Sequence, residues 1–466
     1  MSYPSKLRWS FVLIVVLSQR LAFANEQDGP QSGPVIEGPA RTQAAMEARI
    51  THLESELAAL RELVMQMSNQ QRIAVKEESL DVSAGSAPSP VSTATAEWMG
   101  DDRGFALEGF IQFDSVFTRY SDGQPSDALI ADMLVASEIP VVSGEADSFQ
   151  STNLSAKSTR FAFTTDNQTE AGRVTSLLEL DFSVSDQGNE KISNSWSSRL
   201  RHAYIDWQWS ESDHLVVGQA WTTFMRPQAR PALWDLSGSV GQSFNRQPLI
   251  RWQHDAWTLA VENPATRLTG VEYSREQRGL PDLVARYDGT AGDLGWSIAG
   301  VLRQLNYQQS TDAGDSRKDE ATGYAISFAG NWMVGDNDFR FMMNYGDALG
   351  RYMGLGAFSD GVVDADGNIQ KYDQYGGLVS WSRPVAPRWQ AGVALSVAGA
   401  DLPSTLEYAQ ADLLPEWYSS GHFHLEYRPT RRLSFGSEYI HALKELQSGD
   451  AGTLDRLMFS MRYNLQ

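Results

Sequence analysis

The chain has 466 residues, of which 42% are hydrophobic, and it contains 38 glycines, 14 tryptophans and no cysteine. The absence of cysteine excludes disulfides, thiolate metal sites and thiol nucleophiles, and the net charge of −20 argues against a general nucleic-acid binder, which needs a basic surface. A composition rich in glycine and aromatic residues favours short strands and turns over a helical fold.

The first 24 residues are arranged like a secretory signal peptide. A basic stretch with Lys6 and Arg8 precedes an apolar run at 11–17, and the small-x-small sequence AFA at 22–24 predicts cleavage before Asn25. A membrane anchor is the weaker alternative, because this run is far shorter than the ~20 residues that span a bilayer. We therefore expect an exported protein, and because no later apolar run reaches ~18 residues, any membrane crossing must use strands.

After a flexible segment at 25–40, residues 41–75 are expected to form a coiled-coil helix. Flanking charges such as Arg49 and Glu54 would attract across a parallel interface. The alternative is one amphipathic helix lying on the main body or on a partner, and the pattern leaves dimer and trimer open. Residues 76–103 are predicted to be a flexible linker. The helix prediction rests on a heptad seam of apolar residues: Met46, Ile50, Leu53, Leu57, Leu60, Val64 and Met67.

From Phe105 onward the apolar period changes to two residues. In GFALEGFIQFDSVFTRY (104–120) the odd positions are mostly apolar, whereas the even ones include Glu108, Gln112 and Asp114. The same two-faced pattern recurs to the end of the chain, and many segments end in Trp, Tyr or Phe on the apolar face. A soluble sandwich would not usually carry such a girdle, which is typical of a membrane barrel.

Sixteen strands are predicted, an even number as a closed bacterial barrel requires. The connections alternate long and short along the chain, which indicates an up-and-down barrel with one open and one closed end. We therefore expect an all-β fold over residues 104–466: a sixteen-stranded antiparallel transmembrane β-barrel in the outer membrane, preceded by the N-terminal α-helical coiled coil in the periplasm. The predicted strands are 105–119, 157–166, 172–184, 197–209, 214–224, 248–253, 256–263, 281–288, 293–305, 322–334, 338–346, 371–383, 388–399, 416–428, 432–442 and 454–466.

A barrel of sixteen strands is wide enough to enclose an aqueous channel. The third long loop, 225–247, has the length and the Pro/Gly content to fold inward and narrow that channel. Arginines in a narrow lumen would favour anions, carboxylates above all. The alternative is that they only line the wall opposite acidic residues. The candidate substrate-binding residues, in this loop and the adjoining strands, are Arg199, Arg201, Arg226, Arg230, Arg246 and Arg251.

The segment RLRHAYIDWQW (199–209) raises a question of register. Strict alternation puts Arg199 and Arg201 on the same side as Trp207 and Trp209, facing lipid. Either a β-bulge near His202 turns the arginines toward the lumen, or they lie beyond the apolar band, near the extracellular rim.

Four stretches resemble the DcaP-like porins: SSRLRHAYIDW (197–207), VVGQAWTTFM (216–225), GSVGQSFNRQPLIRW (238–252) and LAVENP (259–264). The resemblance implies a homotrimeric outer-membrane channel with an N-terminal coiled coil, through which small negatively charged solutes such as dicarboxylates diffuse passively past a basic constriction. Its partners would be other copies of the chain, outer-membrane lipid and lipopolysaccharide, and small anionic solutes, without nucleic acid. No catalysis, cofactor or metal is expected.

Two rival functions stay open at this point. One is a structural anchor, with a plugged barrel and a coiled coil that binds the cell wall or a partner protein. The other is an outer-membrane lipid hydrolase that uses Ser420 with His422 or His424, although nothing in the sequence orients a base toward a nucleophile.

Overall fold

The computed structural model describes residues 104–126, 132–183, 195–271, 279–310, 316–404, 406 and 408–465. The signal peptide, the segment at 25–40, the coiled coil at 41–75 and the linker at 76–103 lie outside these residues and stay predictions. Within the described part of the chain, no helix is long and apolar enough to cross a membrane. Its helices are short 3-10 turns: η2 (Ala136–Glu138), η3 (Pro227–Ala229), η4 (Gly350–Tyr352) and η5 (Ala411–Leu413).

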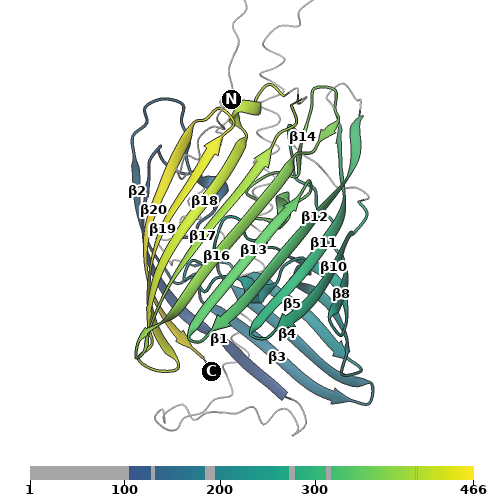
Figure 1. Cartoon of the computed structure of the whole chain (residues 1–466), viewed down its shortest axis with the longest axis vertical. Helices are drawn as coiled ribbons and strands as arrows, with labels where there is room; N and C mark the ends of the chain where they lie inside the picture. Colours follow the sequence, from purple (N-terminus) through teal and green to yellow (C-terminus); the bar gives the residue numbers. More distant parts are fainter. Residues whose placement is uncertain are drawn as a thin grey trace, which may run out of the picture. The chain divides into compact units, whose positions relative to one another are not determined.

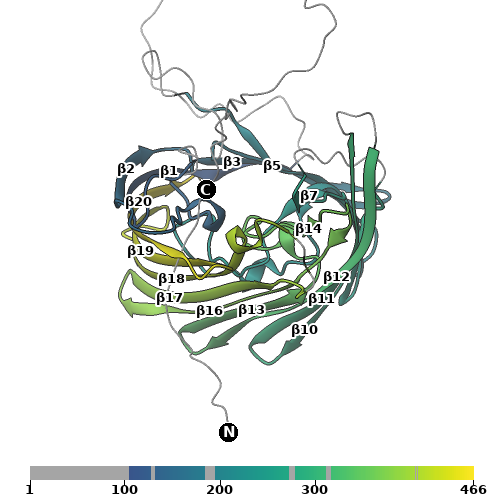
Figure 2. The same cartoon turned by 90° about the horizontal axis from the view of Figure 1, so that it is seen from above.

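One antiparallel sheet closes into a barrel (Figures 1 and 2). Neighbouring strands pair along the chain, and the first pairs with the last, from Phe110 opposite Asn464 to Tyr120 opposite Leu454. The strands are β1 (Gly104–Tyr120), β2 (Phe149–Ser155), β3 (Arg160–Thr169), β4 (Gly172–Asp181), β5 (Arg199–Gln208), β6 (Asp213–Trp221), β7 (Arg246–His254), β8 (Trp257–Glu262), β10 (Asp282–Ala291), β11 (Leu294–Ser310), β12 (Ser316–Val334), β13 (Asn337–Gly346), β16 (Asp373–Ala386), β17 (Trp389–Asp401), β18 (Pro415–Tyr427), β19 (Leu433–Leu446) and β20 (Ala451–Asn464).

β2 and β3 together form one strand of the wall, because both pair with β1 in succession. The barrel therefore has the sixteen strands that the sequence predicts. The second strand was predicted to begin at 157, but it begins at Phe149 and is interrupted between Ser155 and Arg160. At the interruption Lys157 is buried in an ion pair of 3.0 Å with Asp132 of the preceding loop.

Two connections that were predicted to be long are short in the structure. β11 extends to Ser310 and β12 begins at Ser316, so most of the connection predicted at 306–321 is strand. The connection predicted at 443–453 likewise shrinks to 447–450, between β19 and β20. Both ladders continue with polar residues above the apolar band, where the two-residue apolar period that marks a strand is lost. In Figure 1 the short turns gather at the lower end of the barrel and the longer loops at the upper end.

The two faces of the wall differ as the period of two requires. On β1, the side chains of Ile111, Phe113 and Phe117 are exposed on the outside, whereas Gln112 and Asp114 between them are buried inside. The exposed tryptophans lie beside the short turns, as in the aromatic girdle of a membrane barrel: Trp207, Trp209, Trp252, Trp257, Trp332, Trp381 and Trp389.

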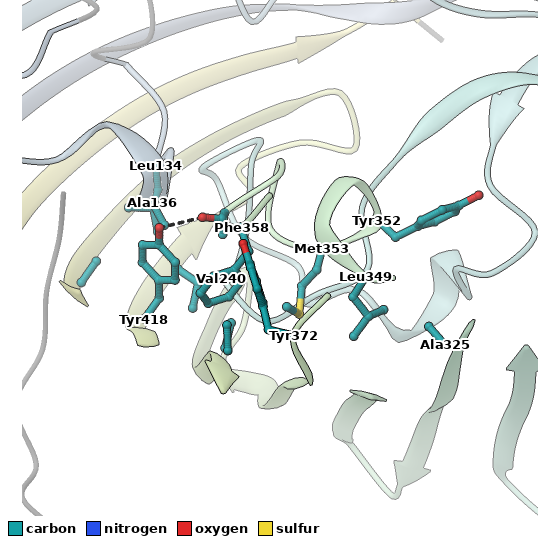
Figure 3. Close-up of a cluster of buried hydrophobic side chains, with 14 of the residues drawn as sticks. Leu134, Ala136, Val240, Ala325, Leu349, Tyr352, Met353, Phe358, Tyr372 and Tyr418 are labelled. Carbon is teal, nitrogen blue, oxygen red and sulfur yellow. Dashed lines mark hydrogen bonds between the residues drawn. The ribbon is translucent and has the colours of Figure 1, made fainter. Parts of the chain in front are cut away.

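Long loops fold into the barrel and share a buried apolar cluster (Figure 3). Tyr418 of β18 donates its hydroxyl to the carbonyl of Ala357 at 2.7 Å, which ties one loop to the wall. A small three-stranded sheet of β9 (Leu268–Thr269), β14 (Gly361–Val363) and β15 (Ile369–Gln370) joins two further loop segments. The interior is therefore partly filled. The cluster includes Leu134, Ala136 and Ile139 of the first long loop, Phe224 and Val240 of the loop after β6, and Leu349, Tyr352, Met353 and Phe358 of the loop after β13.

Candidate pore constriction

The loop between β6 and β7, residues 222–245, crosses the interior of the barrel. We call it the inner loop. Its first part contains the 3-10 turn η3, which follows Arg226. Its later part reaches strands on the opposite side of the barrel. The amide of Gly241 donates to Ser396 Oγ on β17 at 2.8 Å, and the amide of Trp234 donates to Glu438 Oε2 on β19 at 2.5 Å. The backbone of Ser243 bridges to Met353.

Gly241 is where the inner loop comes closest to the wall. A Cβ atom at this position would lie 2.6 Å from both the N and the O of Gly377 on β16, and closer still to the carbonyl oxygen of Val397 on β17. These are backbone atoms of a paired ladder and have little freedom to move. Only glycine fits this contact.

A β-bulge in β5 resolves the register of Arg199 and Arg201. Glu179 of β4 faces His202, but the next residue, Leu180, faces Leu200, so Arg201 is the extra residue. Leu200 is 45% exposed on the outside, whereas Arg201 and His202 are 5% and 6% exposed. Of the two alternatives from the sequence, the structure supports the bulge near His202.

Three of the six candidate arginines form ion pairs, and a fourth, Arg251, is held by two hydrogen bonds. Arg199 holds Asp181 through two hydrogen bonds of 2.9 Å, and Arg201 contacts Glu179 at 2.5 Å and Asp181 at 2.8 Å. Arg226 pairs with Asp288 at 2.7 Å. Arg251 has no ion pair among the described residues, but it donates to Thr223 Oγ1 at 2.8 Å and to the Trp221 carbonyl. These arginines therefore brace the wall and the inner loop.

Arg230 and Arg246 form no ion pair with any described residue. The Arg246 guanidinium lies 4.5 Å from the Trp221 ring centre and 5.9 Å from that of Phe244, and it donates no hydrogen bond within the described part of the chain. Arg230 lies over the same two rings, at 5.5 and 4.6 Å, with one hydrogen bond to the Leu236 carbonyl. Burial, followed by the nearby cations Arg201, Arg160 and Arg340, lowers the pKa of Arg230 to about 9.

The ends of β6 and β7 bring Arg246 into this cluster. The β5–β6 ladder stops at Ala203 opposite Gln219, whereas the β6–β7 ladder continues to Trp221 opposite Arg246. The last pairs of β6 and β7 therefore lie beyond the end of the β5–β6 ladder, and the Trp221 ring packs at 5.4 Å against the ring of His202 at the bulge of β5.

Three further arginines that we did not select from the sequence reach the same region. Arg462 of β20 lies 4.6 Å from the Trp234 ring, Arg160 of β3 lies 3.8 Å from Glu179, and Arg340 of β13 donates to the Arg230 carbonyl at 2.6 Å. Each of these arginines alternates with outward-facing residues on its strand, so the two-residue period could have predicted that it points inward. Their position near the inner loop could not be predicted in this way, because it depends on how the barrel closes.

The structure corrects our view of Ser420 and His422. Glu438 does orient the histidine: its Oε1 lies 2.8 Å from His422 Nδ1, and His422 Nε2 lies 3.1 Å from Ser420 Oγ. The serine is only 1% exposed, however, and its Oγ accepts the amide of Val240 in the inner loop at 3.4 Å. His424 is buried on the same strand with no hydrogen-bond partner for its Nδ1 among the described residues. The described residues also contain no group of three or more acidic, Cys or His side chains placed to hold a metal ion.

Comparisons with known proteins agree with this architecture. A family model described as the DcaP outer membrane protein matches residues 65–398. Among solved structures, the outer membrane channel DcaP of Acinetobacter baumannii is 19% identical, with a TM-score of 0.64, and the match covers 79% of this chain and 99% of that one. Trimeric OmpT of Vibrio cholerae is 10% identical with a TM-score of 0.48 over 78% and 100% of the two chains. An anion-selective porin from Comamonas acidovorans is 9% identical with a TM-score of 0.46, again over 78% and 100%. No curated protein sequence matches.

Proposed function

Because the chain belongs to the DcaP outer membrane protein family and closes the barrel of an outer-membrane porin, we propose that it is a passive channel that prefers small anions, dicarboxylates among them. The observation that carries this proposal is the pair Arg230 and Arg246, which have no ion pair beside the inner loop. The family and the fold point to a channel rather than an enzyme.

The physical basis is the cost of an unpaired charge in a narrow space. Two unit charges 4 Å apart interact by about 4 kcal/mol at the effective dielectric constant of a protein surface, so an anion beside either guanidinium is strongly favoured over a cation. A guanidinium also presents paired N–H groups that match a carboxylate. Since Arg230 and Arg246 contact the same two rings, one solute with two carboxylates can engage both.

Reversal potentials in planar bilayers under a KCl gradient test this proposal. We expect the wild-type channel to be anion-selective, and Arg230→Gln and Arg246→Gln each to reduce that selectivity. The matched control is Arg383→Gln, which removes an exposed arginine from the outer face of β16. A cation-selective wild-type channel, or an equal loss in the Arg383 variant, would refute the assignment of these two arginines.

The structural anchor with a plugged barrel is the second candidate, and the apolar cluster of long loops inside the barrel favours it. The two functions differ in one measurement. Ohmic single-channel steps support the porin, whereas a silent bilayer that contains folded protein supports the anchor, with the coiled coil at 41–75 as the part that would bind the cell wall.

We propose that the channel is a homotrimer whose N-terminal coiled coil, at 41–75, lies in the periplasm. The uneven distribution of exposed tryptophans supports a protein contact on one side, because tryptophan marks the lipid interface. None lies on β19, β20, β1, β3 or β4. Instead Thr165 and Ser176 form a hydrogen bond of 2.7 Å on β3 and β4. Native mass spectrometry checks the assembly, and a monomer in mild detergent would contradict it.

A further inference from the structure

The inner loop is held at two points by a continuous set of hydrogen bonds from the wall. Glu438 Oε2 accepts the amides of Trp234 and Asp235 at 2.5 and 3.1 Å. Glu438 Oε1 lies 2.8 Å from His422 Nδ1, and His422 Nε2 lies 3.1 Å from Ser420 Oγ. Ser420 Oγ in turn accepts the amide of Val240 at 3.4 Å. The set starts and ends on the same loop. We propose that Ser420, His422 and Glu438 form a latch that positions the inner loop and thereby sets the width of the pore.

Glu438 Oε2 already accepts two backbone amides. Within the latch, every donor finds an acceptor when His422 donates through Nδ1 to Glu438 Oε1 and accepts at Nε2. The hydroxyl of Ser420 then donates to His422, and its oxygen is left to accept the amide of Val240. Glu438 and His422 are 0% and 2% exposed, so these bonds are made away from water, where each is stronger and each loss is more costly.

Residues next to the latch also contact the inner loop or leave space for it. Gly436 precedes Glu438 on the same face of β19, and a Cβ atom there would overlap the indole of Trp234. Asp235 accepts the amide of Leu134 at 2.8 Å and contacts Arg456 at 3.5 Å, which links the first long loop to the same point. The latch therefore holds residues 234–240, whereas Arg246 is fixed separately on β7.

That separation distinguishes a positioning role from a direct one. If the latch is broken, the central part of the inner loop is released from β18 and β19, but Arg246 stays on its ladder with β6. Conductance and open-channel noise should change, and the preference for anions that depends on Arg246 should persist. If a latch variant instead failed to fold, its conductance and its preference for anions would be lost together.

The same three residue types also make up the catalytic group of serine hydrolases. Here the hydroxyl of Ser420 faces a backbone amide beneath the inner loop and is 1% exposed. A carbonyl substrate has no approach to it while the loop is docked. The geometry therefore indicates that Ser420, His422 and Glu438 hold the inner loop in place rather than catalyse hydrolysis.

The test uses the full chain in planar bilayers, with variants Ser420→Ala and Glu438→Gln. Both should replace the single steady conductance level expected of the wild type by fluctuating levels, with the reversal potential still on the anion side. The control is Glu445→Gln on the same strand, because Glu445 bonds Trp417 rather than the inner loop. Ser420→Ala removes one hydroxyl, so it carries the test if the Glu438 variant does not reach the membrane.

Amide hydrogen exchange separates this inference, which rests on the proposed channel, from the channel itself. The amides of Trp234, Asp235 and Val240 should exchange faster in both latch variants than in wild-type protein. If the wild type conducts no current, the proposed function fails, but faster exchange still supports the latch. Unchanged exchange and conductance in folded Glu438→Gln, the same changes in Glu445→Gln, or labelling of Ser420 by a fluorophosphonate probe would each overturn it.

Discussion

Replacement of Gly241 by alanine should push the inner loop away from the wall. The added Cβ would lie 2.6 Å from two backbone atoms of Gly377, and ordinary contact begins at 3.4 Å, so these contacts alone require the loop to withdraw by 0.8 Å, and the closer contact with the Val397 carbonyl oxygen requires more. That movement also stretches the hydrogen bond of 2.8 Å from Gly241 to Ser396. Overpacking of this kind costs about 1–3 kcal/mol, and a weakened hydrogen bond adds roughly 0.5–1.5 kcal/mol.

Two assays report on this change. The midpoint of unfolding in denaturant should fall, and the unitary conductance should drop, because a loop that leaves β16 and β17 moves into the open part of the lumen. The matched control is Gly300→Ala on β11, where the added Cβ would meet its nearest atom only at 3.9 Å. If Gly241→Ala has the midpoint and conductance of the Gly300 variant, the inner loop does not rest on the wall as described.

Other predictions concern charge and packing. Arg201→Ala should leave Glu179 short of a buried partner, which lowers the unfolding free energy by about 3 kcal/mol in denaturant titrations and shifts the reversal potential toward cations. Because burial lowers the pKa of Arg230 to about 9, its charge is lost as pH rises through that value, so anion selectivity measured from pH 7 to 10 should decline, and the decline should be smaller in Arg230→Gln. Gly436→Ala should displace Trp234 and quench or shift its fluorescence, whereas Gly300→Ala should not.

The wall of the barrel could be predicted from the sequence because it obeys a local rule. A strand between lipid and water must alternate, and this alternation located all sixteen strands, with its larger errors at the ends of the second, ninth and tenth strands. The rule fails where a strand extends beyond the lipid and its residues no longer alternate regularly. The paired tops of β11 and β12 turn polar side chains outward, and β2 lies in a stretch that we assigned to a loop.

The constriction could be predicted only in part. The length and composition of the segment after β6 indicated that it folds inward, but the pairing of each arginine depends on a neighbouring strand. Arg199 and Arg201 meet their carboxylates through a bulge of one residue, which the sequence signals only as a conflict of register. Arg462 reaches Trp234 across more than two hundred residues, and no local pattern encodes that contact.

The contacts of the inner loop also fix the order in which the pore can be completed. Trp234 and Gly241 dock on β16 to β19, and the bond from Trp234 to Glu438 spans 204 residues of sequence. Contacts between such distant parts of a chain form late in folding. A barrel that has not yet gained its C-terminal strands lacks the surface that the loop needs, so it would leak. The inner loop can therefore narrow the pore only once the C-terminal strands β16 to β19 are in place.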